Sequence, residues 1–95
     1  MIHTDITEAR EAVESYERSV TELSRLASDA RVKWAMSVNR RDRTSPNHSH
    51  FALAEMDVRD NNGRLDHLID ELTQAEWNLF ERTQQVDRLE AAEVA

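Results

Sequence analysis

Metal binding and acid–base catalysis are the chemistries that the histidines and the many carboxylates of this chain could support. His48 and His50 form a His-x-His pair, a spacing that suits neighbouring metal ligands on a strand. His67 and Glu71 are one helical turn apart, so both could face the same ion. No further ligand is placed with His48 and His50, and His67 and Glu71, with Asp70 beside them, are at outer helix positions that face water. The Glu-x-x-His of di-iron helical bundles is absent. The sequence therefore predicts no metal site.

The segment 57–66, DVRDNNGRLD, has the acidic residues and the glycine of a calcium-binding loop but not their spacing. With Gly63 as the invariant glycine, the first and last ligand positions fall on Val58 and Ile69, which have no side-chain oxygen. The chain also lacks a glycine-rich phosphate loop and any serine or cysteine nucleophile placed with a base. We therefore predict no catalytic residue, no cofactor and no enzyme activity.

A basic segment is the remaining chemical feature. The positive residues of this segment are Arg31, Lys33, Arg40, Arg41 and Arg43. Asp42 is the one acidic residue between Arg31 and Arg43, whereas residues 5–22 contain six acidic residues and residues 66–93 contain eight. Lys33, Arg40, Arg41 and Arg43 are candidate contacts for phosphate or carboxylate oxygens. The expected loop has no aromatic residue to stack on a base, and most of the surrounding surface is acidic, so nucleic-acid binding through this segment is an alternative function rather than the main one.

An apolar heptad repeat indicates the elements that must position these residues. In the first half, position a holds Ile6, Val13, Val20, Ala27 and Trp34, and position d holds Ala9, Tyr16, Leu23, Ala30 and Ser37. In the second half, position a holds Phe51, Val58, Leu65, Leu72, Leu79 and Val86, and position d holds Ala54, Asn61, Leu68, Ala75, Arg82 and Leu89. Such a repeat is typical of the seam between coiled helices.

These two halves predict a single all-α domain over residues 1–95, an antiparallel helical hairpin. We expect the first helix over about 4–38, a basic loop over about 39–45 and the second helix over about 46–93. A third of the residues are charged, and there is one glycine and one proline, a composition that leaves little material for the turns of a sheet.

The predicted helix ends rest on local signals. Asp5 and Glu8 have the spacing of a capping box at the start of the first helix. Ser45 is expected to cap the second helix, with Pro46 as its first residue. Residues 61–63, Asn-Asn-Gly, could kink or split this helix, but the heptad register continues across them, which favours a continuous helix.

The predicted pairing of the helices leads to an oligomer. Folding about the expected loop pairs Ala27 and Ala30 with Val58. The N-terminal end of the first helix is then too short to lie opposite Val86 and Leu89, which are left without a partner in the same chain. Exposed seam residues are normally covered, so we expect two hairpins to dimerise into a four-helix bundle.

Large apolar residues outside the seam support the same prediction. Ile69, Trp77 and Phe80 share one side of the second helix. The predicted partner or dimer interface is formed by Ile69, Leu72, Trp77, Leu79, Phe80, Val86 and Leu89. The open alternative is that these residues bind a different protein. Either way, we expect a non-enzymatic protein that acts through helix faces in interaction or assembly.

The charge distribution predicts how two such rods would pair. The net charge is −7, and the hairpin gathers the acids at the end opposite the basic loop. Two rods attract when their loops lie at opposite ends, so the dimer is expected to be antiparallel. An alternative function follows from the acidic surface itself, that of an inhibitor that mimics nucleic acid and blocks a nucleic-acid-binding protein.

Composition also suggests a cellular setting. The chain has no cysteine, no signal peptide and no apolar run long enough for a membrane span, so we expect a cytoplasmic protein. Eleven of the twelve Lys and Arg residues are arginine, a bias typical of GC-rich genomes. This bias favours an accessory protein of an actinobacterium or of one of its phages.

Overall fold

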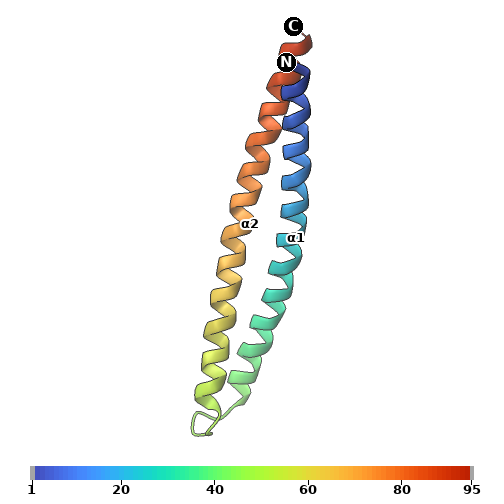
Figure 1. Cartoon of the computed structure of the whole chain (residues 1–95). Coiled ribbons are helices and arrows are strands. Elements are labelled where there is room, and N and C mark those ends of the chain that lie inside the picture. Colours follow the sequence, from blue (N-terminus) through green and yellow to red (C-terminus); the bar gives the residue numbers. More distant parts are fainter. Residues whose placement is uncertain (1, 95) are drawn as a thin grey trace.

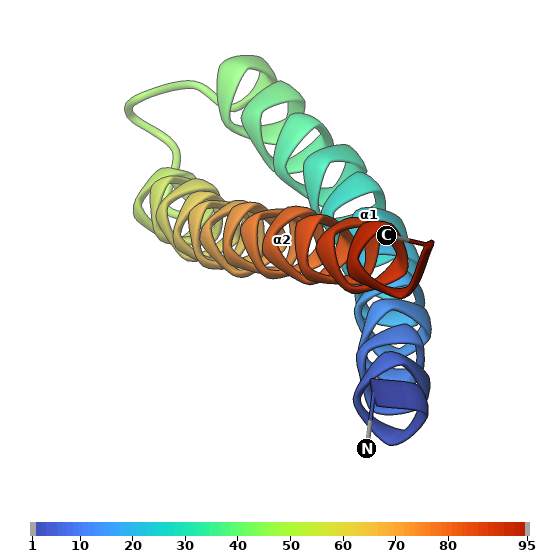
Figure 2. The same ribbon diagram turned by 90° about the horizontal axis from the view of Figure 1, so that it is seen from above.

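Two long α-helices form an antiparallel hairpin in the computed structural model, which describes residues 2–94 and the side chains of residues 5–94. Helix α1 spans Ile2–Arg43 and α2 spans Phe51–Val94. The rod measures 72 × 14 × 14 Å, with both ends of the chain at one end and the loop at the other (Figure 1). Seen along the rod, the helices cross each other (Figure 2). The predicted all-α antiparallel hairpin is confirmed.

The heptad seam is also confirmed. Every residue predicted at position a or d is buried or half-buried, with Arg82 as the one exception. The best-packed part of the seam combines Ala27 and Ala30 of α1 with Leu65 and Leu68 of α2. Small residues on one helix thus meet large ones on the other, which brings the two backbones close together and leaves little empty space.

This core corrects the predicted pairing of the helices. Ala27 and Ala30 pack with Leu65 and Leu68, about one heptad beyond Val58, the residue predicted to lie opposite them. The heptad repeat explains the error, because a shift of seven residues leaves the same positions facing each other. What sets the pairing is the place of the loop, which lies several residues later in the chain than expected.

Helix α1 runs five residues beyond its predicted end at Val38. Arg40, Arg41 and Arg43 occupy its last turn, where positive side chains are stabilised by the negative end of the helix dipole. The Thr44 hydroxyl donates a hydrogen bond of 2.8 Å to the Arg40 carbonyl, which has no partner within the helix. The arginine segment is therefore helical rather than a loop.

Pro46 lies in the loop rather than in the first turn of α2. The Ser45 carbonyl accepts a hydrogen bond of 2.9 Å from the His48 amide, so Pro46 takes the second position of a β-turn, which its fixed φ angle favours. The Phe51 amide then donates to the His48 carbonyl in a second turn. Helix α2 starts at Phe51, five residues later than predicted, and Ser45 is not its cap.

The remaining helix predictions have mixed outcomes. Helix α2 continues through residues 61–63, as the heptad register indicated. The Asn61 side chain donates a hydrogen bond of 2.9 Å to the Asp57 carbonyl one turn earlier and stays within the helix. Asp5 and Glu8 do not form a capping box, because α1 begins at Ile2 and Asp5 already lies in its first turn.

The predicted overhang of α2 is wrong. Because the loop lies later in the chain, α1 is long enough to reach the end of α2 (Figure 1). Val86 and Leu89 are half-buried, and Leu89 lines a shallow groove together with Ala9 of α1. An ion pair of 2.8 Å joins Arg10 to Glu90 beside them. Of the two features that predicted an oligomer, the overhang is therefore absent and the apolar residues outside the seam remain.

Candidate interaction surfaces

The predicted interface residues fall into two groups in the structure. Leu72, Leu79, Val86 and Leu89 are half-buried in the seam between α1 and α2. Their apolar surface is thus used, in large part, within the hairpin. Ile69, Trp77 and Phe80 are exposed on α2. We refer to these three residues as the outer patch.

The outer patch is the most aromatic part of the exposed surface. Trp77 is 57% exposed and Phe80 53%, and Ile69 is 37% exposed. The Trp77 and Phe80 rings are one turn apart and meet edge to face, with their centroids 5.6 Å apart. This edge-to-face contact favours one arrangement of the two rings without taking them out of water. Two large aromatic side chains that remain about half exposed are typical of a binding surface.

The outer patch lies near the middle of the rod. Helix α2 has 44 residues, so its midpoint falls between residues 72 and 73. With a rise of about 1.5 Å per residue, Ile69 lies about 5 Å, Trp77 about 7 Å and Phe80 about 11 Å from this midpoint. Any partner that lies along the whole rod on this side of α2 would therefore cover the patch.

A groove adjoins the outer patch where the seam is weakest. Arg82 occupies a d position but is exposed, and its guanidinium donates a hydrogen bond of 3.0 Å to Gln85 of the same helix. Tyr16 of α1 is half-buried, and the groove between the helices is lined by both residues and by Phe80. Its volume is about 880 Å³, and it is open to solvent. A charged residue in the seam thus leaves room beside Phe80.

Four further apolar residues near the loop are exposed, and the sequence interpretation did not include them as a site. They are Val32 and Met36 on α1 and Leu53 and Met56 on α2, between 55% and 59% exposed. Their heptad positions, c and f, point away from the seam on both helices, so the four residues are divided between the outer sides of two helices. This arrangement differs from that of the outer patch, whose members share one side of α2.

The basic residues lie at and near the loop end of the rod, and intramolecular contacts engage part of their charge. Arg40 lies 3.6 Å from Asp57 of α2, and Arg41 lies 3.2 Å from Asp42. Lys33 and Arg43 form no ion pair with any residue that the structure describes. A shallow groove beside Met36 is lined by Arg40 and Arg43. Positive groups are therefore available at this end for an acidic partner.

The charges divide the rod into unequal parts. Residues 31–60, which form the third of the rod next to the loop, contain six basic and four acidic residues, a net charge of +2. The rest of the chain contains six basic and fifteen acidic residues, a net charge of −9. We refer to these parts as the basic tip and the acidic base.

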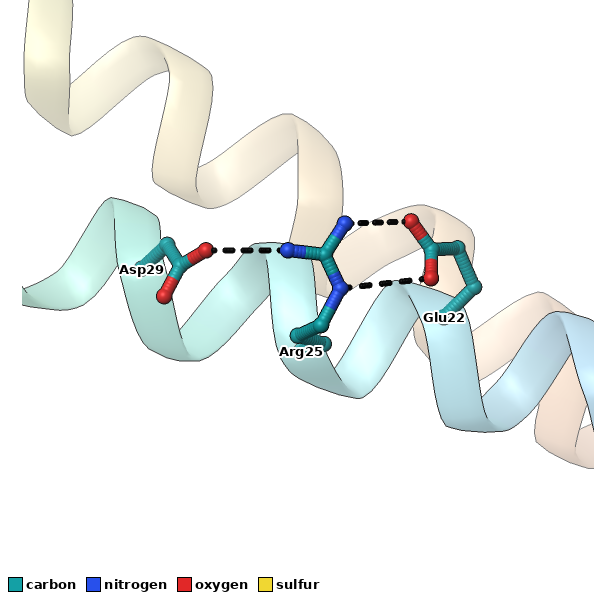
Figure 3. Close-up of polar contacts among 3 residues, drawn as sticks. All are labelled: Glu22, Arg25 and Asp29. Carbon is teal, nitrogen blue, oxygen red and sulfur yellow. Dashed lines mark hydrogen bonds and ion pairs between the residues drawn. The ribbon is translucent and has the colours of Figure 1, made fainter.

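One network of charges in the acidic base is organised along α1. Arg25 donates two hydrogen bonds to the Glu22 carboxylate, of 2.6 and 3.3 Å, and one of 3.3 Å to Asp29 (Figure 3). Hydrogen bonding and attraction to Arg25 lower the pKa of Glu22, and the same contacts raise the pKa of Arg25. All three side chains face solvent, so the network supports the helix rather than a reaction.

The three histidines whose side chains the structure describes do not come together with further ligands. The His48 and His50 rings are 5.2 Å apart in the loop, and the His50 amide donates a hydrogen bond of 3.0 Å to Nδ1 of His48. His67 lies 3.0 Å from Glu71 on the surface of α2. Among the described residues, no group of three or more His, Cys, Asp or Glu side chains is placed to hold a metal ion.

Neither helix, over the part of the chain that the structure describes, has an apolar stretch long enough to cross a membrane.

Comparisons with known proteins identify no relative of this chain. No protein-family model matches it, no curated protein matches it, and no solved structure matches it.

Proposed function

We propose that this chain is a non-enzymatic interaction or assembly protein that acts through the outer face of α2. The outer patch is the surface that binds, with Trp77 and Phe80 as its anchors. In this proposal two hairpins lie side by side and form a four-helix bundle. The observation that carries the proposal is the exposure of two adjacent aromatic side chains, 57% and 53%, near the middle of the rod.

The packing of the hairpin supports this proposal. A two-helix rod has only one seam, and no large side chain in the described part of the chain is fully buried. Trp34, the other tryptophan, is half-buried against the seam core. Covering the outer patch with further helices would remove large apolar side chains from water, and each one stabilises an interface by about 1.5–3 kcal/mol when it is fully buried.

Replacing the anchors tests the proposal. In Trp77→Gln/Phe80→Gln the aromatic rings are lost but glutamine keeps the helix propensity. We expect association to weaken at least about thirtyfold, because a single anchor of this kind already contributes about 2 kcal/mol or more and the contributions of neighbouring anchors are not additive. Sedimentation velocity over a range of concentrations measures the change.

The chain offers a matched control on the same helix. Leu53 and Met56 have the same spacing as the anchors and are 57% and 55% exposed. Leu53→Gln/Met56→Gln should associate like the wild type. Equal association of both double variants would contradict the proposal, and so would a wild-type chain that stays monomeric and binds no partner.

The acidic base supports a second candidate function, an inhibitor that occupies the nucleic-acid groove of another protein. Its fifteen acids, against six basic residues, provide the rows of negative charge that this function needs. Affinity capture from a host lysate distinguishes the two candidates. An inhibitor would retain nucleic-acid-binding proteins that DNA displaces, whereas capture through the outer patch would be lost in Trp77→Gln/Phe80→Gln and unaffected by DNA.

A further inference from the structure

We infer that the partner of the outer patch is a second copy of this chain, packed antiparallel along the full length of the rod. In this dimer the basic tip of each copy lies against the acidic base of the other, and the two outer patches meet at the two-fold axis. The inference rests on the proposed function and adds the direction of the second copy and the extent of its overlap with the first. Three observations carry it: the shape of the rod, the place of the patch and the division of charge.

The shape of the rod favours overlap along its length. One side of a rod of 72 × 14 Å has an area of roughly 1,000 Å², close to the about 800 Å² that each partner buries in a stable dimer. An end-to-end contact of 14 × 14 Å offers roughly a fifth of that area, too little for a specific interface. A partner of the same length therefore needs most of the rod.

The place of the outer patch is consistent with full overlap. When two equal rods overlap completely, the midpoint of one meets the midpoint of the other. Ile69 and Trp77 lie within about 7 Å of the midpoint of α2, on either side of it. The patches of the two copies then cover each other, as a two-fold interface requires. A dimer that is offset by half its length would instead place each patch at the edge of the overlap, away from the patch of the other copy.

The charges decide between the two directions of overlap. A parallel pair places one acidic base, with a net charge of −9, against another, and one basic tip against another. An antiparallel pair places the end of each acidic base beside a basic tip with a net charge of +2, so that the two acidic bases meet only in the middle third of the rod. Single surface charge pairs contribute only about 0–1 kcal/mol, so the outer patch supplies the affinity and the charges select the direction.

Spin labels measure the direction. The chain has no cysteine, so Ser49→Cys in the loop and Ala91→Cys near the other end each give a single labelled site. Double electron–electron resonance on Ser49→Cys alone should show a separation close to the 72 Å length of the rod. A mixture of the two labelled chains should show a short separation, comparable with the 14 Å width of each hairpin.

Each result has a defined meaning. A short separation between two Ser49→Cys labels would show a parallel dimer and overturn the inference, while the proposed function would stand if Trp77→Gln/Phe80→Gln is still dissociated. An assembly larger than two chains would overturn the closed dimer. A monomer at every concentration would overturn the inference as well.

Charge reversal gives an independent check. In Lys33→Glu/Arg43→Glu the basic tip becomes acidic, and both residues are free of ion pairs with described residues. At low salt, the variant should dimerise about tenfold or more weakly than the wild type. At high salt, where charges are screened, this difference in affinity should disappear. A parallel dimer would instead be unaffected by high salt or stabilised by it, and that result would contradict the inference.

Discussion

At the scale of single residues, the ion network of Glu22, Arg25 and Asp29 gives a prediction about pH. Arg25 lowers the pKa of Glu22 below its ordinary value of 4.5. The pair thus stabilises the fold fully above pH 4.5, and this contribution is lost as the pH falls through the lowered pKa. In an NMR titration, the Glu22 carboxyl should have its midpoint below 4.5.

Arg25→Gln is the control for this titration. Removing the guanidinium should return the Glu22 midpoint toward its ordinary value and leave the helix content unchanged, because all three side chains are exposed. If the Glu22 midpoint is the same in both proteins, the hydrogen bonds between the two side chains do not persist in solution.

Much of the burial of single residues followed from the heptad positions alone. The repeat placed Ile6, Ala30 and Leu65 in the seam, and all three are buried. It also placed Arg82 there, but a charged group is costly to bury without a partner, so this side chain turns toward solvent and Gln85. The spacing of residues gives the direction of a side chain, whereas the cost of desolvating its charge also depends on its neighbours.

At the scale of the elements, the seam core predicts which truncations cost stability. Leu68 is 8% exposed and packs with Ala27 and Ala30. Leu68→Ala should lower the free energy of unfolding by about 2–3 kcal/mol, because the small residues opposite cannot fill the space. Urea unfolding, monitored by circular dichroism, measures this change in the free energy of unfolding. Leu53→Ala, at a site 57% exposed, should cost less than about 0.5 kcal/mol. Equal losses would contradict the register of the hairpin.

The helix ends were the part of the fold that the sequence predicted least well. A polar segment with Pro46 is compatible with a helix start or with a β-turn, since proline suits the second position of a turn as well as the first turn of a helix. The hydrogen bond from His48 to Ser45 shows the turn. Because the loop sets the pairing, this local choice moved the core pairing by about one heptad and removed the predicted overhang. Local signals alone do not decide between the two conformations of the segment.

At the scale of the whole molecule, the hairpin combines a thin seam, a central aromatic patch and ends of opposite charge. The hairpin, the outer patch and the acidic and basic ends were all predictable, since each depends on residue spacing or composition. The division of the predicted interface into seam residues and the outer patch was not predictable. The same heptad spacing would result whether Leu72, Leu79, Val86 and Leu89 pack within one hairpin or between two. Their half-buried positions in the seam leave the outer patch as the exposed part of the predicted interface, and we propose that it binds.

The fluorescence of Trp77 as a function of protein concentration tests the central claim most directly. Trp34→Phe removes the other tryptophan, which is half-buried in the seam, and leaves Trp77 as the reporter. We expect the emission maximum of Trp77 to move to shorter wavelength as the chains associate, because its ring leaves water. An emission maximum that stays at the wavelength of a water-exposed tryptophan, while light scattering shows the mass doubling, would place the interface on another face and contradict the account.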